Sequence, residues 1–454
     1  MDRQKVELFE NCPIPKAVVK LAVPSVMGTL VMVLYNFADT YFVGQLNDSV
    51  QTAAVSLAAP MLLAFNAVNN LFGVGASSMM SRSIGKKDYD SAKRAASFSF
   101  WMSAVCAVLI SVTYACFSSP FLKLLGTDAV TVDATARYLF WTVILGAVPA
   151  ILNVVLSNMV RSEGAAMQAS LGVMSGCLLN ILLDPFFVLP RFLGMGAAGA
   201  GCATFLSNCF ATGYLLTVIF VRRRTTVVCI SPKQFGFRGD IVKEVFGVGF
   251  PAAVQNLLNV TGSIILNNFA KAYTEDAVSA MGISHKINLL PLYVSMGVAQ
   301  GVMPLISYNF ASGNRKRMRD TITFVAVFSV ISTTVMGVFI FAFSGNMIAW
   351  FMEKPEVVSY GSRLLRAMAV GIPFLAVDFL AVGVFQAIGK GIYSLFFAIA
   401  RKVVLEIPAL IILNRMMPLY GLGYAQPVSE IVLSVAAIVM LRRIYHLPDT
   451  KIEE

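Results

Sequence analysis

Four side chains in the first half of the chain offer the clearest chemistry. Asp39 and Asp184 are carboxylates within apolar stretches, Asn180 precedes Asp184 by four residues, and Thr204 lies in the next apolar stretch. Ionisable groups are costly inside a bilayer, so each one there calls for an explanation. Two carboxylates, an amide oxygen and a hydroxyl can together hold Na+, or can hold a proton on one of the aspartates. The sequence therefore predicts a site for a coupling cation.

Helix geometry places these groups at one depth. At 1.5 Å per residue, Asp39 lies roughly 22 Å and Asp184 roughly 25 Å above the inner ends of their helices. Thr204 lies roughly 12 Å below the outer end of a hydrocarbon core about 30 Å thick. Asn180 shares a helix face with Asp184. All four side chains are therefore expected to converge on the outer half of one helix bundle. In the alternative interpretation, Asp39 faces water near the end of its helix, and the Asp184-Pro185 pair only marks a break in a helix.

Composition decides the class of protein. Of 454 residues, 57% are apolar and only 13% are charged, and the mean hydropathy is +0.75, so there is too little charge to cover soluble domains. The net charge of +11 lies in short loops, which fits a basic inner membrane face better than nucleic acid. The mixed charges of residues 1 to 16 argue against a cleavable signal peptide. We therefore expect a multi-pass membrane protein.

Twelve apolar runs are separated by charged or Gly/Pro breaks, which predicts an all-α polytopic protein with twelve transmembrane helices. They lie near residues 19–43, 53–80, 94–117, 134–158, 166–189, 196–220, 245–270, 278–304, 321–344, 359–387, 393–415 and 422–441. With the N-terminus inside, the inner segments hold 24 Lys and Arg and the outer segments 8. This imbalance predicts that both termini are cytoplasmic.

The two halves of the chain repeat one another. Pro24 returns as Pro251, Gly164 as Gly389, and Gly85, ahead of a basic run, as Gly313. We predict an N-terminal lobe over 1–221, a cytoplasmic linker over 222–243 and a C-terminal lobe over 244–454. Because each half has an even number of spans, the two six-helix bundles are related by a pseudo-twofold axis along the membrane normal and flank a central cavity. This geometry is typical of rocking-bundle transport.

The chain lacks the motifs of an enzyme or an ATP-driven pump. No G-x-x-x-x-G-K-[ST], H-E-x-x-H or G-x-S-x-G occurs. Two histidines cannot form a histidine metal cluster, and the seven cysteines, which contain no C-x-x-C pair, are expected to be small buried helix residues. We therefore expect no catalytic residues and no cofactor. Transport would be driven by a gradient of H+ or Na+.

The second half carries a different set of charges within its spans. Asp378 occupies the position of Asn153 in the first half, and it is joined by Lys286, Arg401, Lys402 and Glu406. These groups either pair with one another for structural reasons or take part in substrate binding or coupling. The asymmetry places the ion site in the first half.

Several motifs resemble the multidrug and toxic-compound extrusion (MATE) family, most closely its MepA-like bacterial branch. The resemblance covers residues 9 to 443. It depends on Asn36-Phe-Ala-Asp39-Thr-Tyr-Phe-Val-Gly44, Leu71-Phe-Gly-Val-Gly-Ala76, Arg161-Ser-Glu-Gly164, Leu179-Asn180-Ile-Leu-Leu-Asp184-Pro185, Gly194-Met-Gly-Ala-Ala-Gly199 and Pro304-Leu-Ile-Ser-Tyr-Asn309.

The resemblance implies antiport of amphipathic, mostly cationic drugs against H+ or Na+ from a bacterial cytoplasmic membrane. It implies an ion site at Asp39, Asn180, Asp184 and Thr204, the same residues that the depth argument selects. Tyr35 and Tyr138 are expected neighbours of the substrate cavity, together with Asn153, Asp378, Lys286, Arg401 and Glu406. We expect the lipid bilayer and small amphipathic molecules as partners, no nucleic acid, and a monomer.

Three alternatives remain open. A lipid-linked saccharide flippase, or another metabolite exporter of the same superfamily, would need a basic cavity for which Lys286, Arg401 and Lys402 are candidates. An ion channel would need a selectivity filter, and no T-V-G-Y-G run is present. A scaffold without transport would tolerate loss of both aspartates.

The seventh span departs from the pattern of some family members. It has Gln255, Asn256 and Asn259 but lacks the glutamate that those members carry there, so a second-lobe Na+ site is not implied.

Overall fold

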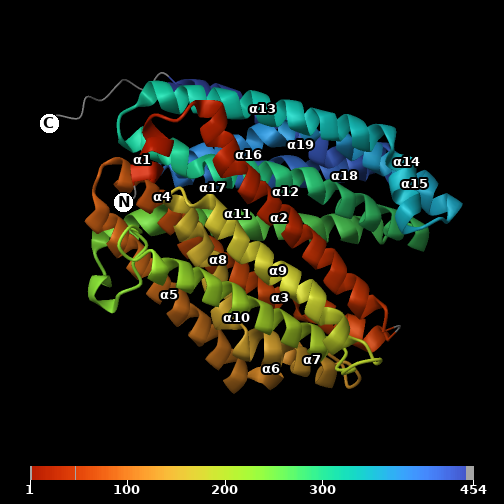
Figure 1. Cartoon of the computed structure of the whole chain (residues 1–454). Coiled ribbons are helices and arrows are strands. Elements are labelled where there is room, and N and C mark those ends of the chain that lie inside the picture. Colours follow the sequence, from red (N-terminus) through yellow and green to blue (C-terminus); the bar gives the residue numbers. More distant parts are fainter. Residues whose placement is uncertain (1–2, 47, 446–454) are drawn as a thin grey trace. The chain divides into compact units, whose positions relative to one another are not determined.

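A computed structural model describes residues 3–46 and 48–445 of the chain. All secondary structure within these residues is helical, which confirms the predicted all-α class (Figure 1). The predicted cytoplasmic tail after Tyr445 lies outside the described residues.

The first half contains six long helical segments. They are α2 (Ile14–Gly44); α3 (Ser49–Val68) continued by the π-helix η1 (Asn69–Val74) and α4 (Gly75–Gly85); α5 (Tyr89–Cys116); α7 (Val132–Leu139) continued by the π-helix η2 (Phe140–Leu145) and α8 (Ala147–Ser162); α9 (Ala166–Val188); and α10 (Ala197–Val221). Short helices α1 (Arg3–Glu10) and α6 (Ser118–Leu124) and the 3-10 turn η3 (Pro232–Gln234) complete this half.

The second half contains six more. They are α11 (Gly239–Ala270); α12 (Glu275–Ala311); α13 (Arg315–Ala342); α15 (Pro355–Ala369) continued by α16 (Ile372–Ala387); α17 (Gly391–Ile399) continued by the π-helix η4 (Ala400–Glu406) and α18 (Ile407–Met416); and α19 (Tyr420–Tyr445). The short helix α14 (Ser344–Phe351) precedes α15. The twelve segments agree with the twelve predicted spans.

Length and hydropathy support membrane insertion. Within the described residues, eight of the helices are long and apolar enough to cross a bilayer, and two bent pairs, α7–η2 with α8 and α15 with α16, bring the number to ten. The α11 segment and the α17–η4–α18 segment complete the set of twelve.

The internal repeat is visible in local geometry. The fourth span bends by 50° before Ala147, and the corresponding tenth span bends by 47° before Ile372. Gly164 and Gly389 both adopt left-handed backbone, with φ of 85° and 78°, where a side chain would be strained. Gly313 is also left-handed, but its counterpart is Lys87 with φ of 62° rather than the expected Gly85. The halves are therefore structural repeats that end their helices in the same way.

The chain forms two compact units. Unit 1 contains Met1–Asn11 and Met27–Ala253, and unit 2 contains Cys12–Val26 and Val254–Glu454. The division passes through the interior of α2 and of α11, shortly after Pro24 and Pro251. Proline removes one backbone hydrogen bond from a helix, so these are the points where α2 and α11 bend most easily.

Within unit 1, the linker after α10 is held against the helices. Glu163 pairs with Lys5 of α1 at 2.5 Å and accepts hydrogen bonds from the Thr226 hydroxyl at 2.8 Å and the Val227 amide at 2.9 Å. The carbonyl of Ile230 accepts from the indole of Trp101 on α5. One buried carboxylate therefore joins α1, the turn before α9 and the linker.

Close packing of α9 on α10 sets the geometry of the predicted ion site. The two helices lie side by side in unit 1 (Figure 1). A Cβ added at Gly176 would lie 2.9 Å from that of Ala211, and one added at Gly172 would lie 2.8 Å from Leu215. The small-xxx-small spacing thus lets the backbones approach, as is common between membrane helices.

We expect Gly176→Val to lower the stability of the protein by roughly 1–3 kcal/mol, because the added methyl groups force α9 away from α10. Gly213→Val on α10 is the matched control, since a Cβ there meets no atom within 4 Å. Thermal unfolding in detergent checks both variants. Equal unfolding temperatures for the two would contradict the packing argument.

Candidate functional site

Asp184 lies at the centre of the predicted site. Its side chain on α9 is 0% exposed, and Asn180, one turn earlier, is 1% exposed. One orientation of the Asn180 amide meets the hydrogen-bonding needs of both neighbouring residues. In this orientation its nitrogen donates to Asp184 Oδ2 at 2.9 Å, and its oxygen accepts from Thr204 Oγ1 at 3.3 Å and from the Thr204 backbone amide at 3.2 Å. The amide therefore connects the carboxylate of α9 with α10.

Helix α2 adds a second carboxylate and a tyrosine to this group. Tyr35 is hydrogen-bonded to the Thr204 side chain and lies within electrostatic range of Asp39, one turn further along α2. Asp39 is within electrostatic range of Asp184, and the buried Tyr138 of α7 is close to both aspartates. The structure thus brings together the four predicted ion-site residues and the two predicted tyrosines.

One oxygen of this cluster is open for chemistry. Asp184 Oδ1 is buried and has no hydrogen-bond partner among the described residues. A buried carboxylate oxygen without a donor is costly, and it is relieved by a proton or by a cation. Because the two aspartates repel each other when both are charged, binding one positive charge between them is favourable. The arrangement can take up and release a single small cation.

A chain of amides extends the site toward α8. Asn153 donates to the Asn208 oxygen at 3.2 Å, and Asn208 donates to the Thr204 carbonyl at 2.9 Å. Asn153 was predicted as a cavity residue, whereas Asn208 was not predicted at all. Its spacing of four residues from Thr204 is the signal that could have identified it.

In unit 2 the predicted charges form two ion pairs. Arg401 of η4 pairs with Glu430 of α19, and its guanidinium lies over the Phe379 ring. Lys402 pairs with Glu406 at 2.6 Å. Lys286 is exposed on α12 and takes part in neither pair. Glu430 is 0% exposed and was overlooked, although it is a single carboxylate within the twelfth apolar run.

Asp378 is next to the first ion pair. It is 2% exposed, faces Glu430, and lines a cavity of about 10 Å³ with Gln255, Asn259 and Arg401. That volume holds about one water molecule. Its carboxyl group lies within hydrogen-bonding reach of the Glu430 carboxyl, and neither Asp378 oxygen receives a hydrogen bond from another described group. Asp378 and Arg401 therefore line one small cavity, and Glu430 lies beside it as the partner of Arg401.

Comparison with known proteins shows the family. The MatE family model matches residues 24–186 and 251–412, so it matches each half once. The chain belongs to the MatE family. The two matches begin at Pro24 and Pro251, the prolines that align the halves. This confirms the resemblance stated from the motifs.

Relatives in this family are transporters. The chain is 30% identical to the "Multidrug export protein MepA" of Staphylococcus aureus strain MRSA252 over 97% of this chain and 96% of that protein. A structure described as the outward-facing conformation of a multidrug resistance MATE family transporter superposes with a TM-score of 0.92 at 26% identity, covering 98% of both chains.

A third relative has a different pocket. A superfamily transporter from Pyrococcus furiosus, described as having a binding pocket of reversed polarity that suggests a different function, gives a TM-score of 0.88 at 25% identity over 98% of both chains. The family and fold of this chain are therefore those of a polytopic transporter, while the polarity of its own sites must be judged from its residues.

Proposed function

We propose that this protein is a cation-coupled multidrug antiporter that exports amphipathic, mostly cationic compounds by alternating access. The observation that carries the proposal is the pair formed by the buried Asp184 and the half-buried Asp39 in unit 1, with no donor to Asp184 Oδ1 among the described residues. Membership in a family whose relatives are named multidrug exporters supports the substrate class. The four residues Asp39, Asn180, Asp184 and Thr204 are proposed to bind the coupling ion.

The geometry favours H+ over Na+ as that ion. With its N–H assigned toward Asp184 and its oxygen toward Thr204, the orientation that suits an ionised Asp184, the amide offers no free oxygen to a metal ion beside Asp184. Hard metal cations take several oxygen ligands, whereas a proton needs one. Na+ coupling would require the amide to turn, after which its oxygen and the Thr204 hydroxyl would join the two carboxylates.

The transport cycle follows from charge. Protonation of the aspartate pair removes negative charge from unit 1, and a bound organic cation then loses an attractive partner. Deprotonation restores the charge and favours rebinding. The ion and the drug therefore compete electrostatically, which is sufficient for exchange when each is bound from its own side of the membrane.

The charges of unit 2 argue against a flippase for a pyrophosphate-linked saccharide. Arg401 and Lys402 are each matched by a buried glutamate, and Asp378 adds further negative charge, so that of the three candidate basic groups Lys286 alone is outside these two pairs. Such a substrate would need unmatched basic groups. We propose that unit 2 contributes structural pairs and that coupling belongs to unit 1.

The proposed setting is a bacterial cytoplasmic membrane with both termini on the cytoplasmic side and the chain acting as a monomer. The basic linker between α10 and α11, with three consecutive arginines at 222 to 224, supports this orientation. Residues 1–221 and 244–454 are proposed as the two lobes on either side of it.

Efflux from proteoliposomes tests the proposal. Ethidium loaded inside would leave when an inward-directed H+ gradient is imposed, and an equal Na+ gradient at constant pH would give no efflux above that of protein-free vesicles. Efflux driven only by Na+ would replace the proton with Na+. No efflux with either gradient would refute the antiporter and favour a flippase or a narrower exporter.

A further inference from the structure

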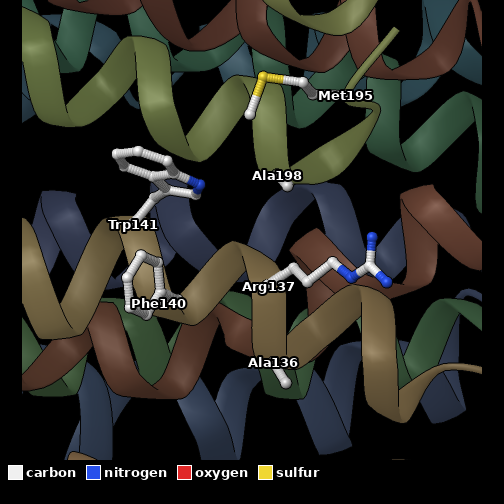
Figure 2. A pocket seen from close by; sticks show the side chains of 6 residues that line it. All are labelled: Ala136, Arg137, Phe140, Trp141, Met195 and Ala198. Atoms are coloured by element: carbon white, nitrogen blue, oxygen red, sulfur yellow. The ribbon is translucent and has the colours of Figure 1, made fainter.

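Unit 1 contains an apolar pocket that the transport chemistry does not use. It has a volume of about 420 Å³, and Figure 2 shows its six lining residues: Ala136, Arg137, Phe140, Trp141, Met195 and Ala198. The π-helix η2 positions Phe140 and Trp141, whose rings pack edge to face at 5.6 Å. The volume is within the range of small-ligand sites, and the walls are carbon-rich.

The pocket has one charged end. In Figure 2 the Trp141 ring and the Arg137 guanidinium lie at opposite ends of the pocket. The Arg137 side chain is 70% exposed and pairs with Asp133 at 3.0 Å, one turn earlier on α7. An exposed ion pair of this kind contributes little stability, so another anion can displace its carboxylate at low cost.

The surroundings of the pocket are those of a membrane interface. The neighbouring segment before α10 exposes Phe192 and Leu193 beside the exposed Arg191. Aromatic and basic side chains gather where lipid tails meet head groups. Ala198 is the second residue of α10, whose 25 residues place the pocket roughly 35 Å from the basic linker, at the opposite face of the membrane. Basic residues are scarce in the segments predicted to lie on the outer side of the membrane, so the presence of Arg137 and Arg191 there needs an explanation.

We propose that this pocket binds an anionic phospholipid, with one acyl chain between Trp141 and Met195 and the phosphate at Arg137. An apolar slot open to lipid with a cation at one end matches a tail joined to an anionic head. Asp133 competes with the phosphate for the guanidinium. The site is separate from the aspartate cluster of the proposed function, so it stands or fails independently of transport.

Lipid retention in native mass spectrometry tests the site. The purified protein is mixed with equal amounts of phosphatidylglycerol and phosphatidylethanolamine that have identical chains. We expect the wild type to retain phosphatidylglycerol preferentially and Arg137→Ala to reduce that retention roughly fivefold. Asp133→Asn should increase it, because the competing carboxylate is gone. Excess glycerol phosphate should displace neither phosphatidylglycerol nor phosphatidylethanolamine, because the acyl chain supplies most of the binding free energy.

Two further variants make the result specific. Ala136→Phe fills the slot and should reduce retention of both lipids, whereas Lys123→Ala removes an exposed charge from the nearby α6 and should change neither. Unchanged phosphatidylglycerol retention in Arg137→Ala would overturn the proposal. So would equal losses in Arg137→Ala and Lys123→Ala, because that result indicates general attraction to basic residues.

Discussion

Replacing Asp184 with asparagine is expected to reduce gradient-driven efflux to the level of empty vesicles. Asparagine keeps the shape of the side chain but cannot take up a proton, and it supplies no negative charge for a cation. Asp184 is 0% exposed and its Oδ1 atom has no partner among the described residues, so the substitution removes the buried oxygen that the proposed cycle protonates. Ethidium efflux under an imposed H+ gradient measures the effect.

A matched control separates this result from a general loss of charge. Asp90→Asn removes a carboxylate from the same unit, but that side chain is 58% exposed and pairs with Arg94, one turn later on α5. Its efflux should remain close to that of the wild type. If Asp184→Asn still exports ethidium at the wild-type rate, the coupling site is elsewhere, and the neighbouring carboxyl groups of Asp378 and Glu430 become the first candidate.

The clustering of the proposed ion-site residues in unit 1 could be predicted from the sequence, because each helix there carries its polar residues at recognisable depths. A rise of 1.5 Å per residue placed Asp39, Asp184 and Thr204 at one level, and the structure brings them together. The orientation of the Asn180 amide and the role of Asn208 depend on contacts between helices, which no single-helix count contains.

Unit 2 shows the limit of the same reasoning. Five charges were grouped as one possible network. Four of them, Asp378, Arg401, Lys402 and Glu406, lie within electrostatic range of Arg401 or are Arg401 itself, whereas Lys286 is exposed. The direct partner of Arg401 is Glu430, which the sequence analysis overlooked. Pairing depends on how α19 and η4 face each other. The π-helical turn from Ala400 to Glu406 shifts that face by an amount that a regular helical repeat does not predict.

The second large effect is expected on stability. Arg401→Met should lower the free energy of unfolding by roughly 3–5 kcal/mol, because it leaves two buried carboxyl groups without their cation. Glu430 is 0% and Asp378 is 2% exposed, and both face the Arg401 guanidinium. Reversible denaturation in mixed detergent micelles, followed by tryptophan fluorescence, measures the change.

Two comparisons show whether the lost charge balance is the cause. The double variant Arg401→Met with Glu430→Met should recover much of the loss, since a buried pair replaced by apolar side chains is often close to neutral. Asp276→Asn, which breaks the exposed pair with Lys354, should cost no more than about 1 kcal/mol. If Arg401→Met is as mild as Asp276→Asn, the buried pair has little structural weight. The Arg401 guanidinium would then be available for substrate binding, which would bring the flippase alternative back into consideration.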